Sequence, residues 1–218
     1  RRVGWTDLKV APLCLGTMLF GWSMSSVAAM DLLDAYVEAG GNFLDTADMY
    51  GPDQTRRSWA QARPHVGVSE QIIGRWLAQG AGRRDRIVLA TKVYGPMGGG
   101  PNDRRLSARH IRRACDDSLR RLRTDHIDLY QMHHVDRDTP WDEIWQAMDL
   151  LVQQGKVIYV GSSNFAGWHI VQANETARRL YLDGEIYRFV ELAFGEPAIA
   201  TQSLYFQWGS QQALHRDP

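Results

Sequence analysis

Short apolar segments alternate with longer segments of helical periodicity through most of this chain, and this alternation limits the folds open to it. Strands that alternate with helices predict a parallel sheet with crossover helices. The predicted strands cover residues 8–18, 42–46, 86–92, 126–133 and 157–164, and the predicted helices cover residues 25–41, 69–80, 107–124, 139–156 and 166–179. The predicted fold class is therefore α/β.

Polar residues mark the predicted starts of three of these helices. Ser25 or Ser26 is expected to cap the first helix, and Ser107 the third. For the fourth helix, Thr139 is the expected cap, with Pro140 in the first helical position, where its missing N–H is tolerated.

A (β/α) barrel and a doubly wound sheet both satisfy the alternation. The barrel is favoured because GTMLFG (16–21), after the first strand, lacks the GxGxxG spacing of a dinucleotide-binding turn. A full eight-stranded barrel takes about 250 residues, and this chain has 218. Five units are clear, and a sixth strand is expected around 198–202. We therefore predict an incomplete (β/α)8 TIM-type barrel with about six of eight units, as one domain over 1–218 with an atypical segment at 181–218.

The charge balance and the cysteines narrow the partners and the compartment. Lys plus Arg equals Asp plus Glu, at 25 each, so no whole-chain field favours nucleic acid or anionic lipid. No stretch approaches the roughly 20 apolar residues of a membrane span, and the N-terminal residues have no signal-like apolar region. Cys14 and Cys115 do not make a disulfide framework. We expect a cytoplasmic protein without a nucleic-acid or membrane partner, and we predict no metal site.

Polar side chains follow three adjacent predicted strands at the point where each strand ends. Asp45 and Tyr50 follow the second strand, Lys92 ends the third and His133 follows the fourth. In parallel α/β folds these ends meet at one edge, where catalytic groups lie. Each residue alone has an ordinary explanation: a capping carboxylate, a rim tyrosine, a solvated lysine or a core histidine. Asp48, between the first two, is expected to be hydrogen-bonded or solvated.

The four side chains complement one another, and this favours a joint role. A phenol ordinarily has a pKa of about 10, and a nearby ammonium favours the phenolate, which makes proton transfer near neutral pH feasible. Burying that ammonium is costly unless a carboxylate pairs with it, and Asp45 can supply the carboxylate. A neutral imidazole would then orient a substrate oxygen.

The sequence resembles the aldo-keto reductase superfamily. Within it, the sequence is more similar to the bacterial and potassium-channel-β-like branches. The DTAxxYG pattern with a downstream lysine and a strand-end histidine is the most specific part. The matching stretches are LCLGTMLFG (13–21), GGNFLDTADMYG (40–51), GVSEQIIGRWL (67–77), VLATKVYG (88–95), DLYQMHHVD (128–136), GKVIYVGSSNF (155–165) and, more weakly, ATQSLY (200–205).

The resemblance implies a catalytic tetrad of Asp45, Tyr50, Lys92 and His133. Tyr50 would protonate a carbonyl oxygen as the general acid, and Lys92, held by Asp45, would make the phenol a stronger acid. His133 would polarise and orient the carbonyl, and it is preferred over His134 because it directly follows the apolar end of its strand. The implied reaction is the reduction of an aldehyde or ketone, a small-molecule carbonyl substrate, to an alcohol.

The resemblance also implies NADPH as the hydride donor. Ser163 and Asn164 match the pair that hydrogen-bonds the nicotinamide carboxamide, and Gln202 matches the glutamine that shares this task. The other residues implied at the cofactor are Gly16, Thr17, Met18 and Asp45.

Two long loops are expected to form the substrate pocket. They cover residues 52–66, with Trp59 and His65, and 95–106, with Met97 and with Tyr94 directly before it. Long loops after parallel strands usually form such pockets.

The chain departs from the family pattern after its fifth unit. The resemblance implies a seventh strand with an aromatic side chain that stacks on the nicotinamide, and an eighth strand with a loop and helix that bind the phosphates. Neither strand is found in this sequence. Residues 185–198 do not resemble the family. Two hypotheses stay open: an NADPH-dependent reductase, or a truncated, non-catalytic or cofactor-sensing relative. An incomplete barrel has open sheet edges, which favour pairing with another chain, so a homo-oligomer that completes the barrel is a further hypothesis.

Overall fold

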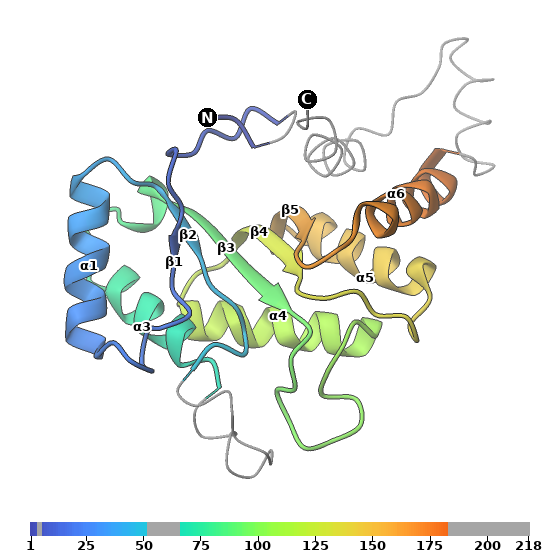
Figure 1. The fold of residues 1–218 in the computed structure, drawn as a ribbon, viewed down its shortest axis with the longest axis horizontal. Helices are drawn as coiled ribbons and strands as arrows, with labels where there is room; N and C mark the ends of the chain where they lie inside the picture. The colour runs from blue at the N-terminus through green and yellow to red at the C-terminus, as the bar shows by residue number, and fades with distance from the viewer. Residues whose placement is uncertain (4–5, 52–65, 183–218) are drawn as a thin grey trace.

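Five strands lie side by side in sequence order and form one parallel sheet (Figure 1). They are β1 (Leu15–Gly16), β2 (Phe43–Asp45), β3 (Val88–Val93), β4 (Ile127–Met132) and β5 (Val157–Ser162). The structure is a computed structural model, and it describes residues 1–3, 6–51 and 66–182. The prediction of an α/β fold with a parallel sheet is confirmed, and the expected sixth strand at 198–202 lies outside the described residues.

A helix or a short helical turn lies in each connection that the structure describes. The helices are α1 (Ser26–Glu38), α3 (Val68–Leu77), α4 (Ala108–Leu122), α5 (Trp141–Gln153) and α6 (Gly167–Leu182), and a 3₁₀ turn, η2 (Arg84–Arg86), precedes β3. Successive helices pack against one another in the order α1, α3, α4, α5, α6. Strands and helices in parallel sequence order are the arrangement of a partial TIM barrel, as predicted.

The helix starts agree with the sequence at two positions and differ at a third. Ser25 caps α1 by accepting from the amide of Ala28 at 3.2 Å, and Ser107 caps α4. The prediction for α5 is wrong by one residue, because Pro140 occupies the N-cap position with an extended backbone. The hydroxyl of Thr139 instead donates to Asp136 at 2.9 Å, so it is not available to cap the helix.

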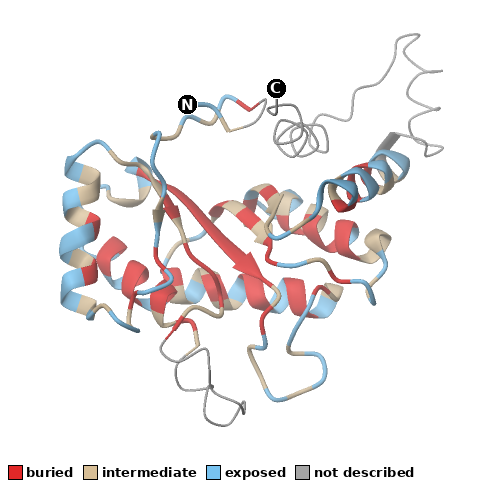
Figure 2. Cartoon of the chain, viewed as in Figure 1, coloured by how far each residue is buried: buried red, intermediate tan, exposed pale blue. Residues whose placement is uncertain are grey.

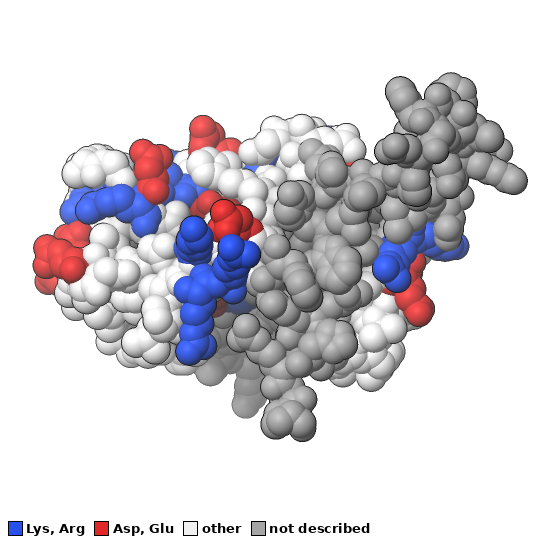
Figure 3. Space-filling view, turned by 90° about the horizontal axis from the view of Figure 1, so that it is seen from above, with Lys and Arg blue, Asp and Glu red and all other residues white. Residues whose placement is uncertain are grey.

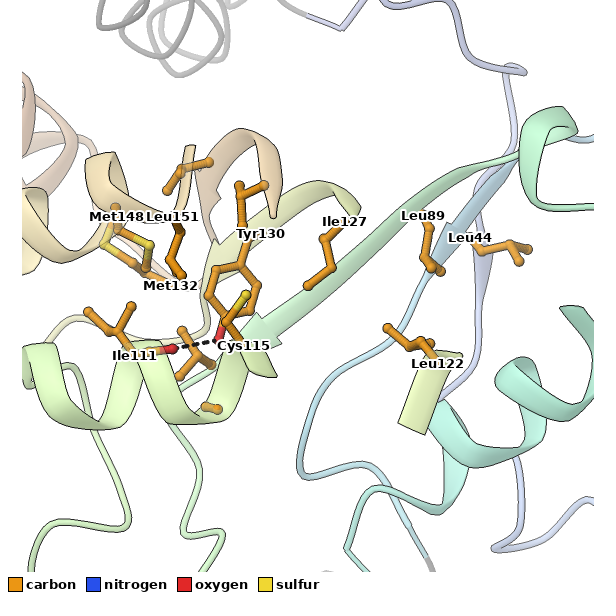
Figure 4. Close-up of a cluster of buried hydrophobic side chains, with 14 of the residues drawn as sticks. Leu44, Leu89, Ile111, Cys115, Leu122, Ile127, Tyr130, Met132, Met148 and Leu151 are labelled. Atoms are coloured by element: carbon orange, nitrogen blue, oxygen red, sulfur yellow. Dashed lines mark hydrogen bonds between the residues drawn. The ribbon is translucent and has the colours of Figure 1, made fainter. Parts of the chain in front are cut away.

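The core lies between the sheet and its helices, and β3 runs through the middle of it. All six residues of β3 are buried, as expected for a strand covered on both faces, and Figure 2 shows this strand in red along its length. Figure 4 shows Leu89 of β3 and Leu44 of β2 beside Leu122 of α4, with Tyr130 of β4 above Ile111.

Helices α3 and α4 approach each other closely at Gly74. A Cβ atom added there would lie 2.0 Å from the backbone oxygen of Arg121, so only glycine fits without a backbone shift. The same contact holds a buried ion pair, in which Arg121 Nε lies 2.6 Å from Glu70 Oε2. Glu70 also accepts from the hydroxyl of Thr91 on β3 at 2.6 Å. This pair therefore ties both helices to the central strand.

Charged side chains of both signs lie next to one another on the face drawn in Figure 3, where basic residues are blue and acidic residues are red. Ion pairs at the surface include Arg179 with Asp142 and Lys156 with Asp116, both at 2.7 Å. No helix within the described ranges has the length and apolar character needed to cross a membrane.

Candidate active site

The ammonium of Lys92 lies at the centre of the candidate site. Its side chain is only 5% exposed, because it extends from the buried strand β3. A lysine ammonium has three N–H donors, and Lys92 has three acceptors: Asp45 Oδ2 at 2.6 Å, the Thr46 carbonyl at 2.8 Å and Tyr50 Oη at 3.3 Å. The predicted partners of Lys92 are thus brought together by β2 and the loop after it.

The carboxylate of Asp45 has a donor on each oxygen. Lys92 contacts Oδ2, and the side-chain amide of Gln131 on β4 donates to Oδ1 at 2.9 Å. Gln131 was not among the residues expected from the sequence. The strand register could have identified it, because Gln131 lies directly opposite Lys92 in the sheet.

Tyr50 is held in place through its backbone as well as its hydroxyl. Its carbonyl accepts from the amide of Ser69, the second residue of α3, at 3.1 Å. The Ser69 hydroxyl lies 2.9 Å from the carbonyl of Thr17 and 3.0 Å from the hydroxyl of Thr46. The first turn of α3 therefore fixes the end of β2 and the turn after β1 together.

His133 lies beside Tyr50, with 5.8 Å between their ring centroids and an edge-on geometry. Burial lowers the pKa of His133 to about 4, and the neighbouring Lys92 ammonium and His134 imidazole act in the same direction. The imidazole is therefore neutral at physiological pH. Its Nδ1 atom is buried and has no hydrogen-bond partner among the described residues.

His134 and Tyr94 continue the aromatic surface from His133. The rings of His133 and His134 are stacked at 4.9 Å, and Tyr94 meets His134 edge-on at 5.2 Å. His134 is exposed, and Met97 in the following loop is half-buried. The other two loop residues singled out from the sequence, Trp59 and His65, lie outside the described residues.

The residues expected at the cofactor lie after β1 and β5, around the same end of the sheet. Thr17 is buried and its hydroxyl donates to the Asp45 carbonyl at 3.0 Å, whereas Gly16 and Met18 are exposed. After β5, Ser163 is half-buried and Asn164 exposed, and the amide nitrogen of Asn164 donates to the His133 carbonyl at 3.0 Å. Gln202 lies outside the described part of the chain.

Asp48 is buried, so the expectation from the sequence that it could be solvated is wrong. Its side chain is fully buried, and neither carboxylate oxygen has a well-formed hydrogen bond to the described residues. Burial, reinforced by the charge of Glu70, raises the pKa of Asp48 well above its ordinary value, although Arg121 and the nearby amides of Met49 and Tyr94 offset part of the shift. The Asp48 carboxyl is therefore buried away from solvent, and this burial is the main cause of its raised pKa.

The geometry brings a phenol, an ammonium, a carboxylate and a neutral imidazole to one edge of the sheet. The ammonium stabilises a negative charge that develops on the phenol oxygen, so this arrangement can donate a proton to a bound oxygen atom. Across the described ranges, no group of three or more His, Cys, Asp or Glu residues could hold a metal ion.

Comparison with known proteins places these residues in a family. Residues 12–183 match the model of the Aldo/keto reductase family. The uncharacterized oxidoreductase YrpG of Bacillus subtilis is 51% identical over 181 residues, which cover 81% of this chain and 52% of YrpG.

Two fungal relatives are more distant. Norsolorinic acid reductase stcV of Emericella nidulans is 37% identical over 78% of this chain and 44% of its own length. Aryl-alcohol dehydrogenase [NADP(+)] of Phanerodontia chrysosporium is 36% identical over 78% of this chain and 45% of its own length. The chain thus spans about half the length of the curated relatives it matches. The match to the family model over most of the chain shows that this protein belongs to the aldo/keto reductase family.

Proposed function

We propose that this chain carries the carbonyl-reducing site of an NADPH-dependent oxidoreductase that converts aldehydes or ketones to alcohols. The observation that supports this most directly is the set of three acceptors around the Lys92 ammonium, one of which is the hydroxyl of Tyr50. A phenol with a buried cation at hydrogen-bond distance is suited to act as a general acid.

Each side chain then has one task. Tyr50 donates its proton to the carbonyl oxygen of the substrate, and the Lys92 ammonium stabilises the phenolate that is left. Asp45 compensates the charge of Lys92, which would otherwise be costly to bury. His133, neutral because its pKa is about 4, is available to hydrogen-bond the same substrate oxygen.

The residues after β1 and β5 fit the nicotinamide end of NADPH. The hydroxyl of Ser163 and the side-chain oxygen of Asn164 can bind a carboxamide, since only the amide nitrogen of Asn164 is used in the hydrogen bonds described. The space over Gly16 is open, because a Cβ atom added there would contact nothing within 4 Å. Bound NADPH would supply the hydride, and the name of one relative includes NADP(+).

The test is the oxidation of NADPH in the presence of 4-nitrobenzaldehyde. We expect slow turnover by the wild type and none by Tyr50→Phe. Tyr130→Phe is the matched control, because Tyr130 is a buried core residue whose hydroxyl faces α4 and not the site. Titration with NADPH, followed by its fluorescence, measures binding separately. Binding without turnover would favour the cofactor-sensing alternative, and neither binding nor turnover would contradict the proposal.

A further inference from the structure

The side-chain amide of Gln131 contacts the one oxygen of Asp45 that Lys92 does not use. Nε2 of Gln131 lies 2.9 Å from Oδ1, and Nζ of Lys92 lies 2.6 Å from Oδ2. The carboxylate is therefore held at both oxygens by donors from two different strands. Such two-point contact fixes the plane of the carboxylate as well as its position.

The register of the sheet makes this contact possible. Gln131 on β4 lies opposite Lys92 on β3, and on its other side it lies opposite Gly161 on β5. A Cβ atom at position 161 would lie 3.4 Å from Cγ of Gln131 and 3.2 Å from Cδ1 of Leu129. The glycine on the neighbouring strand thus leaves room for the stem of Gln131 as it reaches toward Asp45.

We infer that Gln131 is a positioning residue, which holds the Asp45 carboxylate so that Lys92 keeps one N–H directed at Tyr50. The contact with Tyr50 is the longest of the three around the ammonium, at 3.3 Å. If Oδ1 lost its donor, the carboxylate would be free to rotate and to offer both oxygens to Lys92. That stronger pull would act against the contact with Tyr50, because the ammonium has no spare donor.

The amide is suited to this task because it carries no charge. It donates a hydrogen bond to Asp45 at every pH, and it does not compete with Lys92 for the role of counter-ion. A cationic residue at position 131 would weaken the pairing of Asp45 with Lys92, and a carboxylate there would repel Asp45.

The first test uses the protein without cofactor or substrate. The chain has three lysines, Lys9, Lys92 and Lys156, so ¹⁵N-lysine labelling gives a simple spectrum of side-chain ammonium groups. We expect the Lys92 signal to shift, or to broaden through exchange with water, in Gln131→Leu. The Lys156 signal should not move, because this residue pairs with Asp116.

Gln154→Leu is the matched control, since Gln154 is exposed at the end of α5, and it should leave the Lys92 signal unchanged. If Gln131→Leu does not fold, Gln131→Met keeps the length of the side chain without its donor. An unchanged Lys92 signal in a folded variant at position 131 would overturn the inference.

The second test measures turnover. The part of the inference that concerns catalysis rests on the proposed function. Loss of one hydrogen bond of about 1 kcal/mol corresponds to roughly a fivefold decrease in rate. We expect kcat for aldehyde reduction to fall about fivefold in Gln131→Leu with KM unchanged, because Gln131 acts on the proton donor and not on the substrate. A variant with wild-type kcat and a shifted Lys92 signal would refute the catalytic part. Absence of turnover in the wild type would count against the proposed function, and the NMR result would still decide the positioning role.

Discussion

Lys92 and Asp45 form an ion pair between neighbouring strands, with 2.6 Å between Nζ and Oδ2. The lysine side chain is 5% exposed and the aspartate side chain 29%, so loss of the aspartate leaves a nearly buried cation without its anion. We expect Asp45→Asn to lower the free energy of unfolding by about 2 kcal/mol, less than for a fully buried pair because water reaches the aspartate.

Urea denaturation at neutral pH measures this change. Asp116→Asn is the control, since it breaks the more exposed pair with Lys156, and it should cost less than about 1 kcal/mol. Equal effects of the two substitutions would mean that the burial of Lys92 adds nothing to the strength of its pair.

The buried carboxyl of Asp48 predicts an unusual dependence of stability on pH. Because its pKa is raised when folded, the folded state keeps a proton that the unfolded chain releases above its ordinary value of 3.8. Its stabilising effect is therefore complete below that pH and is lost as pH rises toward the raised pKa. Asn cannot ionise, so we expect the stability of Asp48→Asn to fall less between pH 5 and pH 8 than that of the wild type.

The measurement is denaturant unfolding at pH 5 and pH 8, with the exposed Asp31→Asn as control. A variant at position 48 whose stability falls between pH 5 and pH 8 as much as that of the wild type would show that Asp48 does not cause this pH dependence.

The low pKa of His133 predicts a loss of stability at low pH, which is opposite in direction to the effect of Asp48 and can be measured separately. Between pH 6.5, the ordinary value, and pH 4, the unfolded chain binds a proton here that the folded state does not. The contribution of His133 to the free energy of unfolding is therefore fully present above pH 6.5. It decreases as pH falls through this window, by up to roughly 3 kcal/mol in total. NMR of labelled histidine, with His133→Asn to assign the signal, should show a ring that does not titrate between pH 5 and 8. A midpoint above about pH 6 would contradict the neutral imidazole.

Gly74 sets the distance between α3 and α4. We expect Gly74→Ala to destabilise the fold by about 2 kcal/mol, because the new methyl group would lie 2.0 Å from the Arg121 carbonyl and force the helices apart. Gly16→Ala is the control for thermal unfolding, as its methyl group would meet nothing within 4 Å. Similar melting temperatures for the two variants would mean that the helices adjust without cost.

Much of this arrangement could be predicted from the sequence, because strand order and strand ends leave clear patterns. The alternation of apolar and helical segments predicts the parallel sheet, and the polar ends of its strands indicate Asp45, Lys92 and His133. The spacing of Tyr50 after β2 depends on a loop, yet the motif around it is specific enough to identify the residue. The catalytic and cofactor roles of these residues stay predictions.

The remaining features depend on contacts that sequence patterns do not encode. Gln131 donates to Asp45, which lies 86 positions earlier in the sequence. Nothing in the sequence around a glutamine within a strand indicates so distant a partner. Asp48 looks like other polar loop residues, and only the structure shows that its side chain is buried, near enough to Glu70 of α3 and Arg121 of α4 to be affected by their charges. Pro140 is compatible with both the cap and the first helical position, and the hydrogen bond from Thr139 to Asp136 decides between them.

The hydrogen bond from Ser69 to the Tyr50 carbonyl has a consequence for how this protein could be redesigned. The amide of Ser69, in the first turn of α3, binds the Tyr50 carbonyl directly, so these two points of the chain are held together by a contact that does not involve residues 52–65. We therefore expect Tyr50 and Ser69 to stay in place when the length or composition of the sequence at 52–65 is varied. This makes residues 52–65 a suitable position for sequence libraries that leave the candidate proton donor, Tyr50, in place.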